Sequence, residues 1–217
     1  MSELKLIIGN KNYSSWSLRP WLAMKVAGIA FVEERIPLYG PGSKEKILAV
    51  SPAGKVPCLV DGEVRIWDSL SICEYLAEGT PVLWPLDRGT RAVARSISAE
   101  MHSGVQNLRT HMGMNIRRRS PGKGRTPEVL AEITRIAGMW EGCRARHAAE
   151  GPFLFGGFSI ADAMYAPVVL RFRTYAVDLP PEARGYADTV LALPALQEWM
   201  ADAVRETESL PQFEPDA

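Results

Sequence analysis

A cluster of hydroxyl side chains stands where a short polar loop leads into an expected helix. Residues 13–19 read Tyr-Ser-Ser-Trp-Ser-Leu-Arg. At a helix N-terminus the exposed backbone N–H groups and the helix dipole favour a bound anion. A serine hydroxyl there can also donate a hydrogen bond to a thiolate and lower the pKa of that thiol. The run therefore fits an anion or thiolate site, or plain capping of the helix by Ser14 or Ser15.

Two further dipeptides have the chemistry to bind a ligand. Val56-Pro57 precedes an expected strand, where proline cannot donate to the ladder. A cis bond would turn the backbone N–H and C=O of Val56 outward, whereas a trans proline at a strand start fits the sequence as well. Asp68-Ser69 opens an expected helix, where a carboxylate caps the first turn and can also bind an ammonium group.

The elements that carry these residues alternate between strand and helix in the first part of the chain. A strand, a helix and a second strand within about 33 residues predict a βαβ unit with parallel strands and a right-handed crossover. Asp61-Gly62 between two strand-like runs predicts a hairpin with a type I′ turn. The expected order βαβαββα covers residues 4–8, 16–26, 31–36, 43–50, 56–60, 63–66 and 68–78.

The second part of the chain has almost no strand signal. A connector with two prolines at 79–87 separates residues 1–80 from an expected all-α domain at 88–217. Ser159 and Asp162 fit a capping box that starts a buried helix. About five helices are expected, with the long helical stretches at 88–118, 127–150, 159–176 and 194–208.

Composition excludes several classes of protein. Of 217 residues, 47% are apolar, 25 are Lys or Arg and 25 are Asp or Glu, so no positive field favours nucleic acid or an anionic membrane. Three scattered cysteines predict buried thiols in a reducing compartment, and the N-terminus lacks an apolar signal core, so a cytoplasmic protein is expected. His102 and His111 are out of phase on one helix, and no metal site is expected.

Three stretches taken together resemble the glutathione transferase family, over nearly the whole chain. Residues 51–59 resemble its Asn-Pro-x-Gly-x-Val-Pro-x-Leu stretch, residues 67–76 its Glu/Gln-Ser-x-x-Ile-x-x-Tyr-Leu stretch, and residues 158–163 its second-domain capping box. The resemblance implies an α+β protein of two domains. A thioredoxin-like domain at 1–80 would bind glutathione, and an all-helical domain at 88–217 would bind the second substrate.

The resemblance also assigns residues to glutathione. Residues 14–19 are similar to the Ser-Ser-Cys-Ser-x-Arg signature of the zeta class (maleylacetoacetate isomerase-like), which implies that Ser14 activates the thiol. Trp16 replaces the signature cysteine, Asp68 replaces the usual Glu or Gln, and Ser15 or Tyr13 are alternative activating residues. The implied glutathione-binding residues are Ser14, Ser15, Lys55, Val56, Pro57, Asp68 and Ser69.

For the second substrate, Arg109 and Met112 lie three apart on one expected helix face and, with Trp16, form the candidate pocket. A dimer or surface contact is the alternative role for that face. Zeta-class members hold a substrate carboxylate with an arginine whose position falls on Thr174 here, with Arg171 and Arg173 as neighbours before it in the chain. This departure favours general conjugation over isomerisation.

We therefore expect a cytoplasmic glutathione transferase with glutathione as co-substrate, no metal and a small electrophile as second substrate. Homodimerisation is implied by the resemblance, and neither nucleic acid nor membrane is expected as a partner. The alternatives are a glutathione-dependent cis-trans isomerase of a maleylacetoacetate-like diacid and a non-catalytic binding module. Basic residues at 117–125 fit a solvated loop or a surface that attracts anions.

Overall fold

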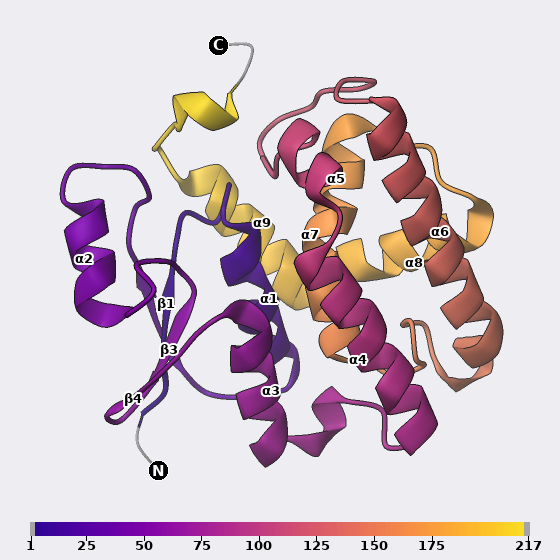
Figure 1. Cartoon of the computed structure of the whole chain (residues 1–217), viewed down its shortest axis with the longest axis horizontal. Helices are drawn as coiled ribbons and strands as arrows, with labels where there is room; N and C mark the ends of the chain where they lie inside the picture. The colour runs from indigo at the N-terminus through magenta and orange to yellow at the C-terminus, as the bar shows by residue number, and fades with distance from the viewer. Residues whose placement is uncertain (1–2, 215–217) are drawn as a thin grey trace.

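The computed structural model describes residues 3–214 and contains a four-stranded sheet beside a set of packed helices (Figure 1). The strand order is β2-β1-β3-β4, with β1 and β2 parallel and the other pairs antiparallel. This confirms the predicted mixed sheet and its βαβ start. The strands are β1 (Lys5–Ile8), β2 (Val32–Arg35), β3 (Cys58–Asp61) and β4 (Val64–Ile66).

Alternation along β1 directs helices to both faces of the sheet. Leu6 and Ile8 belong to the main core, whereas Ile7 packs in a small cluster with Ile47 of the opposite face. Figure 1 shows α2 on one side of the sheet and α1 and α3 on the side of the helical domain. These helices are α1 (Ser15–Val26), α2 (Ser43–Val50) and α3 (Ser69–Gly79).

The hairpin turn lies one residue later than predicted. Asp61 pairs with Val64, so Gly62 and Glu63 form the turn, and of these two only Gly62 has a left-handed φ, of 55°. That pattern belongs to a type II′ turn rather than the expected type I′. The reason is that Asp61 stays in β3, where its carboxylate accepts a hydrogen bond from the hydroxyl of Tyr75 on α3, at 2.8 Å.

The helix expected at 88–118 is two shorter helices. Val105 has a φ of 49°, and a Cβ on Gly104 would lie 2.7 Å from the carbonyl oxygen of Glu100, so the chain turns sharply there. Glu132 then accepts hydrogen bonds from the first N–H groups of the second helix. A helix at 181–191 was not among those predicted. The helices of the described second part are α4 (Arg88–Ser103), α5 (Gln106–His111), α6 (Pro127–His147), α7 (Ile160–Tyr175), α8 (Pro181–Leu191) and α9 (Pro194–Arg205).

Helix α7 is the central element of the helical part and packs against α1, α4 and α8. Its predicted capping box is confirmed: the Asp162 carboxylate accepts hydrogen bonds from the N–H groups of Ser159 and Leu154, at 2.8 and 3.1 Å. Burial raises the pKa of Asp162 to about 6. One core cluster extends from Leu6 to Ala203, so the sheet and the helices share a continuous apolar interior.

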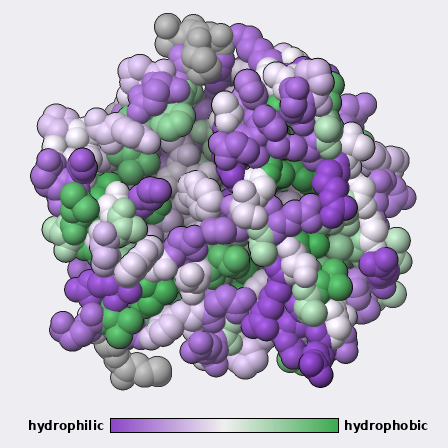
Figure 2. Space-filling model, in the orientation of Figure 1, coloured by the Kyte–Doolittle hydropathy of each residue, from purple (hydrophilic) through white to green (hydrophobic). Residues whose placement is uncertain are grey.

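The surface carries no broad apolar area on the face drawn in Figure 2, where hydrophilic and hydrophobic residues are interspersed. Within residues 3–214, no helix has the length and apolar content needed to cross a membrane. Cys58, Cys73 and Cys143 are free thiols, and all three are buried.

Candidate functional site

The start of α1 holds a chain of buried hydroxyl groups. Ser14 is the N-cap of α1, and its Oγ accepts from the Ser17 N–H at 3.4 Å. Its hydroxyl donates to Ser17 Oγ at 2.7 Å, and the Gly9 N–H donates to the same Ser17 oxygen at 3.1 Å. The capping prediction for Ser14 is thus confirmed. Its hydroxyl belongs to a chain of hydrogen bonds that runs from Ser14 to Ser17 and ends at the backbone N–H of Gly9.

Ser15 and Tyr13, the two alternatives to Ser14, face different surroundings. Ser15 is buried, and its Oγ accepts a hydrogen bond from Arg171 Nη2 at 3.3 Å. The Tyr13 hydroxyl donates to Glu214 Oε1 at 2.7 Å and accepts from Arg117 Nη2 at 2.9 Å. The Tyr13 hydroxyl is therefore bound to the C-terminal segment.

Two buried arginines lie beside this helix start without a carboxylate partner among residues 3–214. Arg19 contacts Ser69 Oγ at 3.4 Å and Met101 Sδ at 3.1 Å, and Arg171 donates to the carbonyl of Met112. Burial, followed by the charges of neighbouring arginines, lowers the pKa of Arg19 to about 9. Burial lowers the pKa of Arg171 to about 10. Within the described residues, the Nε atom of each has no hydrogen-bond partner. Such uncompensated positive charge favours an anion.

The Trp16 side chain connects Arg19 to residues of the helical domain. The guanidinium carbon of Arg19 lies 4.1 Å from the centre of the Trp16 ring, and that of Arg109 lies 5.7 Å away. The His102 ring meets Trp16 edge-on, with centroids 5.2 Å apart. Trp16 and Arg109, both predicted pocket residues, therefore lie together.

Met112, the third predicted pocket residue, lies at the end of the helix that carries Arg109. Helix α5 ends at His111, so Met112 is its C-cap, and the Met112 side chain is fully buried. Its place in the second-substrate pocket stays a prediction.

The arginine neighbouring the family position on α7 faces the α1 start. Thr174 is buried and donates its hydroxyl to the Asn115 carbonyl at 3.0 Å. Arg171, one turn earlier, reaches Ser15, whereas Arg173 is half-buried beside Arg119. The sequence analysis assigned no role to Arg171 or Arg173. Only the packing of α7 on α1 shows that Arg171, and not Arg173, faces the start of α1.

The remaining predicted glutathione contacts lie at the starts of β3 and α3. Lys55 is exposed, Val56 is half-buried and Pro57 is buried, and the Val56–Pro57 peptide bond is cis. Asp68 is the N-cap of α3, where its Oδ1 accepts from the N–H groups of the next turn. Ser69 is fully buried beside Arg19.

The sequence did not indicate a contact between Asp68 and the helical domain. His102 Nε2 on α4 lies 2.7 Å from Asp68 Oδ2. No local pattern could have found it, because the two residues belong to separate elements of separate domains. Across residues 3–214, no three His, Cys, Asp or Glu side chains form a group able to hold a metal ion.

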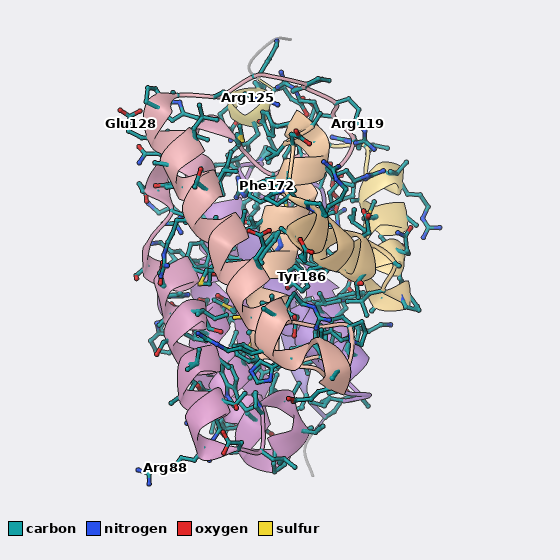
Figure 3. All side chains as sticks on the ribbon, turned by 90° about the vertical axis from the view of Figure 1, so that its right-hand side faces the viewer. Arg88, Arg119, Arg125, Glu128, Phe172 and Tyr186 are labelled. Carbon is teal, nitrogen blue, oxygen red and sulfur yellow. The ribbon has the colours of Figure 1, made fainter. Side chains whose placement is uncertain are left out.

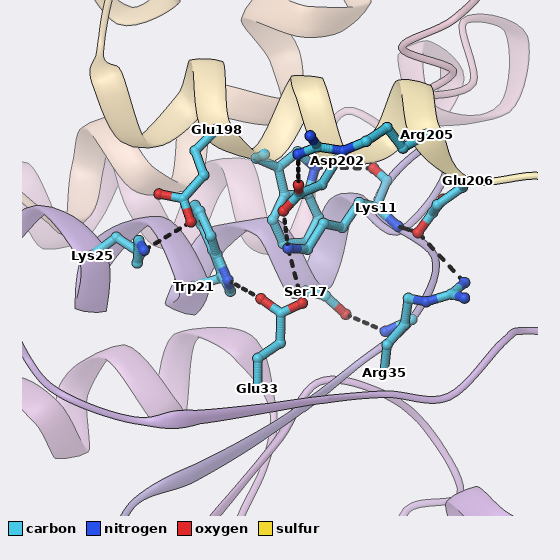
Figure 4. A network of polar contacts seen from close by, with 12 residues as sticks. Lys11, Ser17, Trp21, Lys25, Glu33, Arg35, Glu198, Asp202, Arg205 and Glu206 are labelled. Atoms are coloured by element: carbon cyan, nitrogen blue, oxygen red, sulfur yellow. Dashed lines mark hydrogen bonds and ion pairs between the residues drawn. The ribbon is translucent and has the colours of Figure 1, made fainter.

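A polar network fixes the loop that carries Ser14 (Figure 4). Buried Lys11 forms ion pairs with Asp202 of α9 at 2.7 Å and with Glu33 of β2 at 2.8 Å. The Glu206 carboxylate accepts from the backbone N–H groups of Lys11 and Asn12. The C-terminal segment therefore holds the hydroxyl-bearing loop against the sheet.

The predicted basic loop lies at one end of the helical part, where Figure 3 labels Arg119, Arg125 and Glu128. Arg117 is not solvated as a whole: its guanidinium donates to the carbonyls of Glu206 and Glu208. Arg125 donates to the carbonyl of Ala176. Part of this cluster thus supports the C-terminal segment.

Comparison with known families decides the classification. The sequence model described as glutathione S-transferase, N-terminal domain, matches residues 13–78, and that of the glutathione S-transferase C-terminal domain matches residues 123–202. Maleylacetoacetate isomerase of Rattus norvegicus is 31% identical over 173 residues, which are 77% of this chain and 77% of the relative. The chain belongs to the glutathione S-transferase family. The expected enzyme family and its two-part fold are confirmed.

Two other members show how far the similarity extends. Glutathione S-transferase Z2 of Arabidopsis thaliana is 29% identical over 216 residues, covering 92% of this chain and 94% of the relative. The structure of a glutathione transferase homolog from Burkholderia gl BGR1, with bound glutathione, has a TM-score of 0.71 at 22% identity and covers 95% of this chain and 100% of its own. The latter similarity establishes the fold.

Proposed function

We propose that the chain binds glutathione along the starts of α1, β3 and α3 and joins the intact glutathione, through its sulfur, to an electrophilic carbon. Family membership, the relatives named glutathione S-transferase and the glutathione bound in the Burkholderia structure support this activity. In this proposal Val56 pairs with the cysteinyl backbone, flanked by Lys55 and Pro57. Asp68 and Ser69 bind the γ-glutamyl group.

The buried hydroxyl chain at the start of α1 carries the proposal. The oxygens of Ser14 and Ser17 are 2.7 Å apart, and the Gly9 N–H already donates to Ser17. Hydroxyl protons rotate to suit their partners. When a sulfur arrives, Ser17 donates to Ser14 and Ser14 donates to the sulfur. Hydrogen bonds in such a chain polarise one another and strengthen the last donor.

Positive charge around the hydroxyls favours the thiolate. A free thiol has a pKa of about 8.5 and is mostly protonated at neutral pH. The N-terminus of α1 and the buried Arg19 and Arg171, which pair with no carboxylate in residues 3–214, lower the thiol pKa, because opposite charge stabilises the ionised form. The thiolate then attacks an electrophilic carbon held beside Trp16 and Arg109, and binding both reactants together supplies proximity.

The ultraviolet absorbance of the thiolate tests this mechanism directly. In the wild type, bound glutathione is expected to ionise below the pKa of the free thiol. Ser14→Ala is expected to raise that pKa and leave the calorimetric affinity nearly unchanged. Ser96→Ala is the matched control, because Ser96 is exposed on α4 and donates only to its own helix, to Ala92. An unchanged thiol pKa in Ser14→Ala would remove Ser14 from the mechanism.

A second candidate function is the cis-trans isomerisation of a maleylacetoacetate-like diacid. Buried Arg171, which has no carboxylate partner in the described part of the chain, favours it, together with the relatives named maleylacetoacetate isomerase. In this reaction the thiolate adds to the double bond, the resulting single bond rotates, and elimination returns the thiolate. Arg171→Gln is expected to abolish turnover of a diacid while keeping conjugation of a neutral electrophile. Equal losses with both substrates would contradict a carboxylate site.

The organisation of the protein completes the proposal. Residues 1–80 hold glutathione, residues 88–217 hold the second substrate, and 79–87 link them. The proposed second-substrate pocket also includes Met112, at the C-cap of α5. A homodimer is proposed on family membership, and the cytoplasm on the three buried free thiols, which a reducing compartment preserves. Light scattering should give about twice the chain mass of 23.9 kDa.

A further inference from the structure

Two residues that depart from the family pattern touch the same side chain. Trp16 stands at the signature cysteine and Asp68 at the usual Glu or Gln. The ring of His102 contacts Trp16 edge-on, and its Nε2 lies 2.7 Å from Asp68 Oδ2. His102 belongs to α4 of the helical domain, so it connects the two positions across the domain boundary.

The two carboxylate oxygens of Asp68 are held by different partners. Oδ1 accepts from the N–H groups of Leu70 and Ser71, at 3.1 and 3.3 Å, and Oδ2 faces His102. Each carboxylate oxygen accepts more than one hydrogen bond, so Oδ2 retains capacity for a further donor. Aspartate is one carbon shorter than glutamate. These contacts hold the Asp68 carboxylate in one position at the start of α3.

The His102 ring is itself oriented by its neighbours. Trp16 packs against its edge and is in turn stacked on the Arg19 guanidinium. Nδ1 of His102 is buried and has no partner among residues 3–214. A neutral imidazole has one N–H, and with the proton on Nε2 this N–H donates to Asp68. A hydrogen bond from a neutral donor does not cancel the negative charge of the carboxylate.

The surroundings of Asp68 suit a cation. A surface groove of about 540 Å³ runs from Asp68 and His102 along α3, past Glu74 and Glu78. Arg95 pairs with Glu74 at 3.0 Å, and within residues 3–214 the other two acidic groups of the groove, Asp68 and Glu78, form no ion pair with an arginine. An ammonium group that reaches Asp68 thus enters a region of negative charge.

We propose that His102 is a positioning residue for glutathione: it holds the Asp68 carboxylate where the α-ammonium of the γ-glutamyl group binds. The inference rests on the proposed function and adds a residue of the helical domain to the glutathione site. His102 acts through Asp68, so its loss should raise KM for glutathione and leave kcat nearly unchanged.

Two variants separate the hydrogen bond from the packing. His102→Leu keeps an apolar side chain against Trp16 and removes the N–H, whereas His102→Gln keeps an N–H donor. Calorimetry with glutathione should show a loss of affinity of about five- to tenfold for His102→Leu, the size expected for one ordinary hydrogen bond, and less than about twofold for His102→Gln. His111→Leu is the control, since His111 is an exposed histidine at the end of α5. Thermal unfolding verifies that all variants are folded.

A glutathione analogue makes the test specific for the ammonium. Glutaryl-Cys-Gly lacks the α-ammonium and keeps the carboxylate, the thiol and the rest of the peptide. It should bind wild type and His102→Leu equally. Equal weakening of both ligands in His102→Leu would show a general structural role and overturn the inference, as would unchanged glutathione affinity. Absence of glutathione binding in the wild type would overturn the proposed function as well.

Discussion

Helices α1 and α3 begin with the same local device but in opposite electrostatic surroundings. At α1 the cap is the buried Ser14, with Arg19 and Arg171 close by. At α3 the cap is the exposed carboxylate of Asp68. Glutathione carries a thiol and an ammonium group, and these two helix starts match them in charge. The difference shows that capping sets where a helix begins, and the neighbours set what that end can bind.

The start of α7 serves as a comparison, because both of its capping residues are buried and no ligand is proposed to bind there. At α7, Ser159 and Asp162 form a capping box in which both residues are buried. The Asp162 carboxylate accepts from the backbone of residues 154 and 159. Changes at α7 should therefore affect stability, whereas changes at α1 and α3 should affect catalysis and binding respectively.

The largest effect is expected at α1. Ser14→Ala should lower kcat/KM about 100-fold, the typical cost of removing one donor to a developing anion. Ser17→Ala removes the second member of the hydroxyl chain and should lower kcat/KM about tenfold, because Ser14 then loses a partner at 2.7 Å. Steady-state kinetics measure both. A Ser17→Ala enzyme with wild-type kinetics would show that Ser14 acts without the chain.

The next largest effect concerns the stability of α7. Asp162→Ala leaves two buried N–H groups unpaired and should lower the free energy of unfolding by about 3 kcal/mol. Urea denaturation measures it, and the KM for glutathione of the folded variant should match the wild type. A change in KM would mean that α7 also shapes the glutathione site.

Asp162 also predicts a pH dependence of stability. Its folded-state pKa, about 6, lies above the ordinary aspartate value of about 4 because of burial. Its contribution to stability is therefore fully present below about pH 4 and is lost as the pH rises to about 6. Unfolding free energies measured across this range should show that decline in the wild type and lack it in Asp162→Ala.

A smaller effect is expected at α3. Asp68→Asn keeps a capping oxygen and removes the charge, so KM for glutathione should rise about tenfold while kcat changes less than about twofold. The thermal midpoint should stay near that of the wild type. A fall in kcat with unchanged KM would show that Asp68 acts in the catalytic step. It would contradict the division between catalysis at α1 and binding at α3.

The smallest effect tests the arginine charge at α1. Arg19→Met keeps much of the buried volume and removes the cation, so the pKa of bound glutathione thiol should rise by about half a unit to one unit. Stability should not fall, since no carboxylate within residues 3–214 pairs with the buried guanidinium. Arg88→Met, at the exposed start of α4, is the control. An unchanged thiol pKa would assign the effect to the helix and hydroxyls alone.

Local chemistry explains which parts of the site could be predicted. The capping serine, the capping aspartate and the box at Ser159 each bond within three residues of themselves, so their spacing is visible in the chain. The family motifs also fix the element order. By contrast, the end of the first long helix depends on Glu132 of α6, which caps the start of α5. The expectation of one continuous helix at 88–118 was therefore wrong.

The sequence by itself determined the succession of strands and helices in the first part of the chain, the capping residues of α1, α3 and α7, and membership of the family. Tertiary structure alone decided that Arg171 meets Ser15 and that His102 meets Asp68. The physical reason is range: capping and alternation act between residues a few positions apart. Burial of a charge and its pairing depend on which distant elements pack together.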